Sequence, residues 1–127
     1  MQFISDFDLQ SMQDMQRVAK MVDSFYIMLE EVPAEERTYD NSKEGYARIK
    51  AELNALKLSQ EIRPLNELTT KQVKIAIDLW QEDINFHKKY DSMSDFVIGR
   101  HRSQFNRLFR SMIQGEQAKP DTRKPSN

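Results

Sequence analysis

Apolar residues recur at steps of three and four in four separate stretches of the chain. In the first stretch this series comprises Met15, Val18, Val22, Phe25 and Leu29. Such steps return to the same face of an α-helix, which has 3.6 residues per turn. The pattern predicts a long amphipathic helix over residues 6–31, with Ser5 as its N-cap and Pro33 just beyond its end.

Two further stretches with this pattern follow a polar loop. They predict a second helix over residues 41–59 and a third over residues 69–90. The third helix has the clearest start signal in the chain, because Thr69 followed by Gln72 fits a capping box.

The last periodic stretch predicts a fourth helix over residues 94–114. Ser94 is suited to its N-cap and Gly115 to the position just past its end. Residues 116–127 contain two prolines and almost no apolar side chain, so we expect a disordered C-terminal tail there.

Four amphipathic helices with short connections favour an all-α fold, a four-helix bundle-like single domain over residues 1–115. The length of 127 residues fits one domain, and 39% hydrophobic residues are too many for a fully disordered chain. The chain has no cysteine, which excludes disulfides and thiolate metal sites, and its two histidines exclude a His-rich one.

The first predicted helix has a broader apolar face than one neighbouring helix usually covers. Met21, Phe25 and Met28 widen it beyond the main series, and methionine side chains adapt readily to varied partners. Two interpretations follow. Either this helix lies centrally in the bundle, or its extra face binds a protein partner or a second copy of the chain in a homo-oligomer.

The fourth predicted helix carries a face of arginines without acidic neighbours. Arg100, Arg107 and Arg110 cluster on a helical wheel, Arg102 flanks them, and residues 98–113 include no Asp or Glu. A solvated helix normally interleaves both charges, which adds a few tenths of a kcal/mol per pair. Guanidinium groups suit bidentate binding of phosphate or carboxylate.

Several targets fit this arginine face. It could contact a nucleic-acid backbone, an acidic surface of a protein partner, or the chain's own Glu-rich segment at residues 30–36. The alternative is a basic face that contacts only solvent.

The chain offers little that points to catalysis. It lacks a Gly-rich phosphate loop, a nucleophile elbow and an HExxH pair. Asp83 and His87 lie four residues apart and could orient a general base, but the simpler interpretation places His87 on an apolar face and Asp83 in solvent. His101 falls within the apolar face of the fourth helix and is expected in the core. We therefore predict no catalytic residues, no metal and no cofactor.

These observations predict a non-enzymatic helical interaction protein, a regulator, adaptor or inhibitor that docks on a protein partner. Its expected contact residues are the arginines and the methionine-rich face described above. The alternative is a nucleic-acid-binding module that uses the basic face at residues 94–114. No stretch is apolar enough for a membrane span and the first residues lack a basic signal-peptide region, so we expect a cytoplasmic protein.

Overall fold

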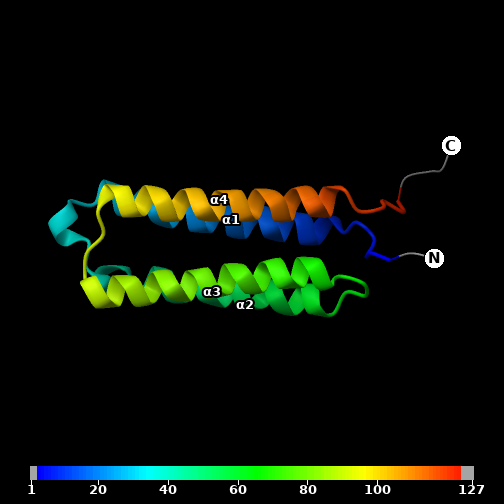
Figure 1. Cartoon of the computed structure of the whole chain (residues 1–127), viewed down its shortest axis with the longest axis horizontal. Coiled ribbons are helices and arrows are strands. Elements are labelled where there is room, and N and C mark those ends of the chain that lie inside the picture. Colours follow the sequence, from blue (N-terminus) through cyan, green and yellow to red (C-terminus); the bar gives the residue numbers. More distant parts are fainter. Residues whose placement is uncertain (1–2, 124–127) are drawn as a thin grey trace.

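The computed structural model describes residues 3–123, and this part of the chain forms a four-helix bundle with up-down-up-down topology (Figure 1). Its helices, with the short 3₁₀-helix η1 between the first two, are α1 (Leu9–Glu31), η1 (Ala34–Glu36), α2 (Tyr39–Glu61), α3 (Glu67–Tyr90) and α4 (Asp95–Gln117). The helices lie in two pairs, α1 with α4 and α2 with α3. The predicted all-α bundle is confirmed.

The start of α1 lies three residues later than the sequence analysis predicted. Asp8 is the N-cap, because its carboxylate accepts hydrogen bonds from the Ser11 amide at 3.0 Å and the Ser11 hydroxyl at 2.6 Å. Ser5, the predicted cap, is buried instead and donates to the side-chain oxygen of Asn66. A carboxylate also complements the positive end of the helix dipole, which favours Asp8 as the cap.

Two other predicted starts also need correction. The N-cap of α2 is Thr38, whose hydroxyl accepts from the Asn41 amide at 3.3 Å. α3 begins at Glu67, so Thr69 lies inside its first turn rather than capping it. The prediction for α4 is confirmed, since the Ser94 hydroxyl accepts from the Val97 amide at 3.2 Å.

The end of α4 differs from the prediction because the chain continues to make specific contacts. Gly115 lies inside the helix, which extends to Gln117, and the side chain of Glu116 is fully buried. Beyond the helix, the amide of Phe7 donates to the carbonyl of Pro120 at 2.7 Å. Part of the predicted tail therefore packs against the N-terminal segment, and residues 124–127 lie outside the described part.

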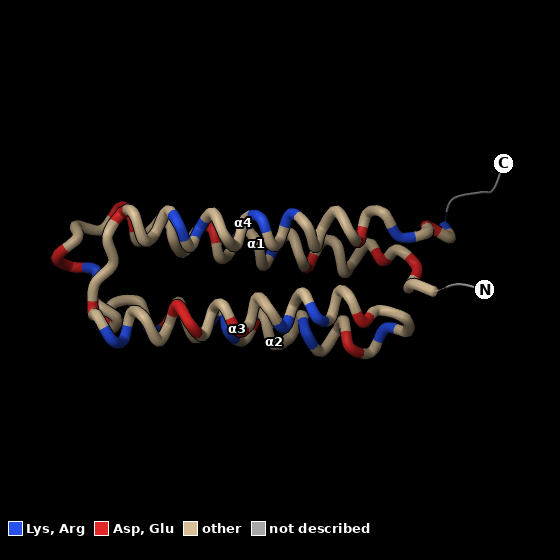
Figure 2. The backbone as a smooth tube through the Cα atoms, in the orientation of Figure 1, with Lys and Arg blue, Asp and Glu red and all other residues tan. Residues whose placement is uncertain are grey.

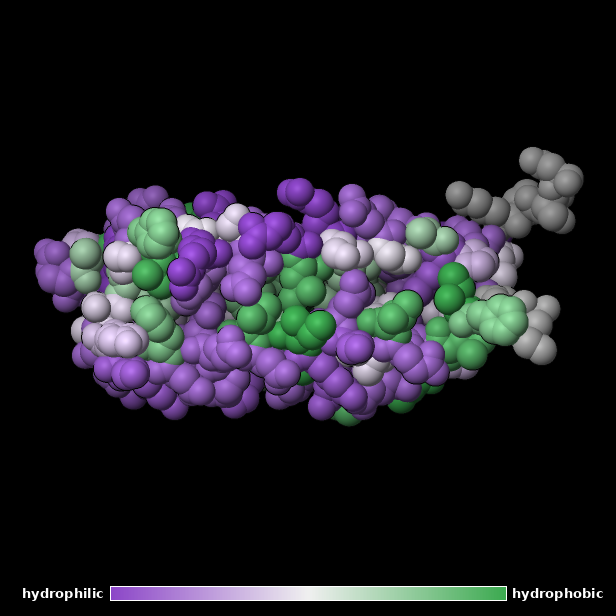
Figure 3. Space-filling model, viewed as in Figure 1, coloured by the Kyte–Doolittle hydropathy of each residue, from purple (hydrophilic) through white to green (hydrophobic). Residues whose placement is uncertain are grey.

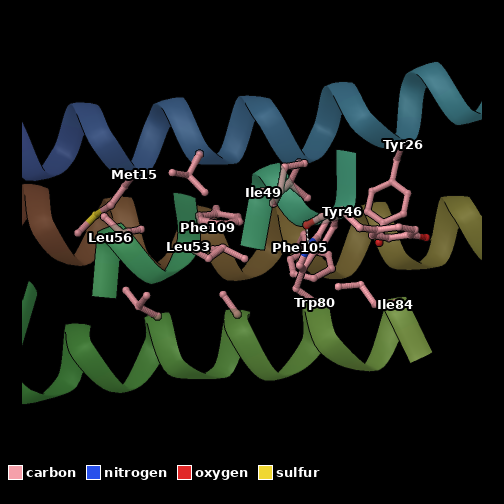
Figure 4. Packing of buried hydrophobic residues seen from close by; sticks show 14 of the residues in the cluster. Met15, Tyr26, Tyr46, Ile49, Leu53, Leu56, Trp80, Ile84, Phe105 and Phe109 are labelled. Atoms are coloured by element: carbon pink, nitrogen blue, oxygen red, sulfur yellow. Dashed lines mark hydrogen bonds between the residues drawn. The ribbon is translucent and has the colours of Figure 1, made fainter. Parts of the chain in front are cut away.

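The core is a continuous apolar layer between the two helix pairs. Figure 4 shows Trp80 reaching from α3 toward Phe105 and Tyr46, with Tyr26 approaching from α1. All four of these side chains are at most 1% exposed, and the Trp80 indole N–H donates to the Tyr46 carbonyl at 3.0 Å. The main apolar series of α1 contributes Met15, which is fully buried. The predicted core face of α1 is confirmed.

Buried polar groups close one end of the bundle. The carboxylate of Glu116 accepts two hydrogen bonds from the Arg63 guanidinium, both at 2.9 Å, and one from Lys119 at 2.9 Å. Its second oxygen also accepts from the Asp8 amide at 3.0 Å. Hydrogen bonds to several donors are what allows a charged group to remain buried. This cluster ties the α2–α3 loop to the end of α4.

A second polar cluster closes the opposite end. Arg37 is buried and donates to the carbonyls of Glu30, Val32 and Met93 at 2.8 to 3.0 Å. It also pairs with Asp95 at 2.7 Å. One guanidinium thus satisfies backbone carbonyls in both connections at this end.

None of the helices in residues 3–123 combines the length and apolar character needed to cross a membrane.

Candidate functional site

Two of the hollows in the described chain lie between pairs of helices that pack less closely. One lies between α1 and α2, and the other lies between α3 and α4. Because α4 covers α1 and α3 covers α2 in the view of Figure 1, the clefts face opposite sides of the molecule. Their volumes are about 580 Å³ and about 460 Å³, respectively.

The cleft between α1 and α2 has an apolar floor. Met21, Phe25 and Met28 of α1 line it together with Ile49 of α2. Met28 is 69% exposed, whereas Met21 and Phe25 are half-buried against the core. The structure therefore brings the three predicted contact residues of the first helix together in one concave surface.

Gly45 allows Phe25 to form this floor. A Cβ atom at position 45 would stand 2.9 Å from the edge of the Phe25 ring, which is closer than real Cβ contacts allow. In the close packing that glycine permits, the Phe25 ring lies 4.6 Å from the Tyr46 ring and 5.3 Å from the Trp80 ring, between centroids. This role of Gly45 was not predictable from the sequence, because an isolated glycine in a helix has no distinctive pattern.

Replacing Gly45 with alanine is expected to push the Phe25 ring outward into the cleft. Alanine raises intrinsic helix propensity by about 1 kcal/mol, which offsets the repacking of one ring. We therefore expect the free energy of unfolding to change by no more than about 1 kcal/mol, while the cleft becomes shallower. Urea denaturation would measure the first effect, and NMR contacts from the Phe25 ring to Met21 and Met28 would report the second. Unchanged contacts of this ring would contradict the role given to Gly45.

Basic side chains border the apolar floor. Lys20 lies on the α1 side and Arg48 on the α2 side, and neither forms an ion pair with another residue of 3–123. Arg17 also lines the cleft but is engaged by Glu52 at 2.6 Å. Glu44 is the only carboxylate among the lining residues in the described chain. The border of this cleft is therefore net positive.

Basic positions recur along α4 (blue in Figure 2), and the side chains of the predicted arginine face lie in different environments. Arg102 is bound within the chain, since its Nε lies 2.6 Å from an Asp23 oxygen on α1. Hydrogen bonding to Arg102 holds the pKa of Asp23 below its ordinary value, despite partial burial of the carboxyl. This pair was not predictable from the pattern of α4, because the acid comes from another helix. The Arg102 guanidinium is therefore engaged within the chain, and its role in partner binding stays a prediction.

The other three arginines have no carboxylate of residues 3–123 within ion-pair distance. Arg100 and Arg107 line the cleft between α3 and α4, whereas Arg110 lies beside Ala19 of α1. The Glu-rich segment at residues 30–36 is thus not their partner within the described chain. Their role in partner binding stays a prediction.

Asp83 contradicts the sequence analysis most clearly, because it is buried rather than solvated. Its carboxylate accepts a hydrogen bond from the Tyr26 hydroxyl and lies 3.1 Å from Nδ1 of His101, without hydrogen-bond alignment. Burial and the nearby Asp83 charge raise the pKa of the Tyr26 hydroxyl well above its ordinary value, so it remains a donor. The expected core position of His101 is confirmed, although its partner was not foreseen.

His87, the other histidine, has a structural role. Its Nδ1 lies 2.7 Å from the Tyr46 hydroxyl and its Nε2 lies 2.9 Å from the Arg37 carbonyl. Both ring nitrogens are thus engaged by groups of the chain itself, as the interpretation of His87 as a core residue expects. Across residues 3–123, no group of three His, Asp or Glu side chains is arranged to hold a metal ion.

Comparison with known proteins adds no functional information. No family model, curated protein or solved structure matches the chain.

Proposed function

We propose that this protein is a non-enzymatic docking module that binds an amphipathic helix of a partner protein in the cleft between α1 and α2. One observation carries the proposal: Met28 remains 69% exposed beside the Met21 and Phe25 side chains in a concave surface. Contiguous exposed apolar surface in a hollow is typical of binding sites rather than of ordinary protein surface.

The shape of the cleft favours a helix as the bound element. It follows the two antiparallel helices α1 and α2, and its apolar residues Met21, Phe25 and Met28 recur along one face of α1. An amphipathic helix placed along such a groove would insert apolar side chains spaced by three and four residues. The flexible methionines suit a binding surface that adjusts to its partner.

The charge at the border indicates the chemistry of the partner. Lys20 and Arg48 have no ion pair within residues 3–123, so acidic residues on the flanks of the bound helix would complement them. Such charges at the rim of an interface contribute mainly to association rate and specificity, while the apolar centre supplies most of the affinity.

A second copy of the chain fits this cleft less well. Symmetric pairing through α1 would place the basic borders of two identical clefts against each other, and like charges at an interface disfavour association. The nucleic-acid alternative is also less favoured, because Arg102 is bound to Asp23 and Arg110 lines a different hollow from Arg100 and Arg107.

A displayed library of amphipathic helices with a fixed leucine stripe and randomised flanks would test the proposal. We expect selection on the purified protein to enrich helices with Asp and Glu beside the stripe. Met28→Lys is expected to weaken their binding at least about tenfold, measured by fluorescence anisotropy, because a charge would be buried in the apolar contact.

The matched control is Leu68→Lys, which adds the same charge at a 77%-exposed position of α3 outside the cleft. It should leave binding unchanged. The double substitution Lys20→Glu with Arg48→Glu should shift selection toward helices with basic flanks. Failure to enrich any helix, or equal binding by the Met28→Lys protein, would overturn the proposal. A dimer that sedimentation detects and Met28→Lys dissociates would instead indicate a second copy as the occupant.

A further inference from the structure

The cleft between α3 and α4 differs from the docking cleft in its chemistry. Arg100, Gln104 and Arg107 of α4 line one side, and Glu82 of α3 lines the other. Figure 3 views this face of the bundle, where apolar side chains show in a band between the polar surfaces of α3 and α4. The volume of about 460 Å³ falls in the range of small-molecule sites, roughly 300–1,000 Å³.

Two arginines of α4 line the same cleft, and one of them, Arg107, also donates a hydrogen bond to the Ser103 hydroxyl at 3.4 Å. Arg100 and Arg107 are two helical turns apart on one face of α4, about 10.5 Å along the helix axis, and Gln104 lies between them. Arginine side chains are long enough for both guanidinium groups to converge over Gln104. Neither arginine has a carboxylate of residues 3–123 within ion-pair distance. Two such groups without a counter-ion repel each other, and an anion between them would relieve that repulsion.

The floor of this cleft holds a buried imidazole. His101 is 6% exposed, lines the cleft and has Nδ1 without a hydrogen-bond partner among the described residues. Asp83, which accepts a hydrogen bond from the Tyr26 hydroxyl, also lines this cleft, and its carboxylate lies 3.1 Å from this Nδ1. Because Nδ1 is buried against this carboxylate, the imidazole forms part of the cleft floor, and the two arginines of α4 are the groups that could bind an anion.

We infer that the cleft between α3 and α4 binds a small phosphate monoester. Arg100 and Arg107 hold the phosphate between them, with His101 below it. Guanidinium groups match phosphate oxygens through paired hydrogen bonds, which favours phosphate over a halide or other spherical anion. Glu82 and the Gln104 amide, on the two sides of the same cleft, are placed to bind hydroxyl groups of the organic part. This site is separate from the docking cleft and does not depend on the proposed function.

Calorimetric titration with glycerol 3-phosphate, compared with inorganic phosphate, tests the inference. We expect the monoester to bind more tightly than the free ion, because only the monoester offers hydroxyl groups to Glu82 and Gln104. Arg100→Gln combined with Arg107→Gln should weaken monoester binding at least about tenfold, since two charge-assisted contacts are lost. Glu82→Gln should tighten binding of inorganic phosphate, because it removes one of the two carboxylates that line the cleft.

Arg110→Gln provides the matched control, because Arg110 is an exposed and unpaired arginine of the same helix outside this cleft. It should leave affinity unchanged. NMR gives an independent readout: the ¹⁵N resonances of the His101 ring should shift on addition of the monoester, and those of His87 should not.

Three results would overturn the inference. One is the absence of monoester binding at millimolar concentration. Another is equal loss of affinity in the Arg110→Gln protein, which would indicate diffuse charge attraction. The third is binding of a single-stranded oligonucleotide without binding of the monoester, which would support nucleic-acid contact instead. Equal affinity for inorganic phosphate and the monoester would overturn the assignment to an ester.

Discussion

Replacing Trp80 with alanine is expected to lower the free energy of unfolding by about 3–5 kcal/mol, the range measured when large aromatic core residues are truncated. Trp80 is 1% exposed and lies at the centre of an aromatic cluster, with ring centroids of Tyr46 and Phe105 at 5.3 and 5.7 Å. Its removal leaves a cavity between the two helix pairs, which the surrounding rings fill only in part. It also removes the hydrogen bond to the Tyr46 carbonyl.

Urea denaturation followed by circular dichroism at 222 nm would measure this loss. Leu68→Ala is the matched control, since Leu68 lies on the same helix with 77% of its surface exposed. It should change the free energy of unfolding by no more than about 0.5 kcal/mol. Similar stabilities of the two variants would contradict the central position of Trp80 in the core.

The second large effect is expected at the buried carboxylate of Glu116. Glu116→Gln should lower the free energy of unfolding by about 3 kcal/mol at neutral pH, because it leaves Arg63 and Lys119 without their counter-charge. Both cations are largely buried, with side chains 13% and 9% exposed, so water compensates them poorly. Glu61→Gln, at an exposed position on α2, should have little effect.

The same carboxylate makes stability depend on pH in the acidic range. Burial acts to raise the pKa of Glu116, but hydrogen bonds from Arg63 and Lys119 and from the Asp8 amide outweigh it, and the net pKa lies below the ordinary value of 4.5. A carboxyl with a lowered folded-state pKa contributes stability above its unfolded-state pKa. That contribution is lost as the pH falls below about 4.5 and through the folded-state pKa.

Thermal unfolding between neutral pH and pH 3 would show this dependence. The difference in melting temperature between the natural protein and Glu116→Gln should shrink as the pH falls, because protonation removes the same charge. A difference that stays constant over this range would contradict the role given to the ionised carboxylate.

The sequence predicted the helices well because apolar periodicity can be read from neighbouring residues, and the residues that carry it form the core of the bundle. It placed the starts of α1, α2 and α3 less well, because several residues near each start are able to cap a helix and tertiary contacts decide among them. Ser5 illustrates this, since its burial against Asn66 leaves the capping role to Asp8. The polar clusters at the two ends were not predictable, because Arg63 and Glu116 are 53 residues apart in the chain.

In the candidate sites, too, grouping along one helix was predictable from the sequence, whereas contacts between helices were not. The grouping of Met21, Phe25 and Met28 follows from spacing on one helix, and the structure places all three in one cleft. The basic border contributed by Arg48 comes from a different helix, as does the Asp23 carboxylate that binds Arg102. Asp83 was expected in solvent, because a single charged residue beside an apolar stripe carries no sign of a buried partner such as Tyr26.

The hydrogen bond between Phe7 and Pro120 brings the first and last described segments of the chain together at one end of the bundle (Figure 1). A short linker could therefore join them, and new ends could be opened in the loop that contains η1, giving a circular permutant with the same helix packing. For the same reason, a fluorescent protein or an affinity tag joined next to either of these two segments would lie at one pole of the bundle. Both clefts run along its sides, so such fusions would leave them accessible to ligands.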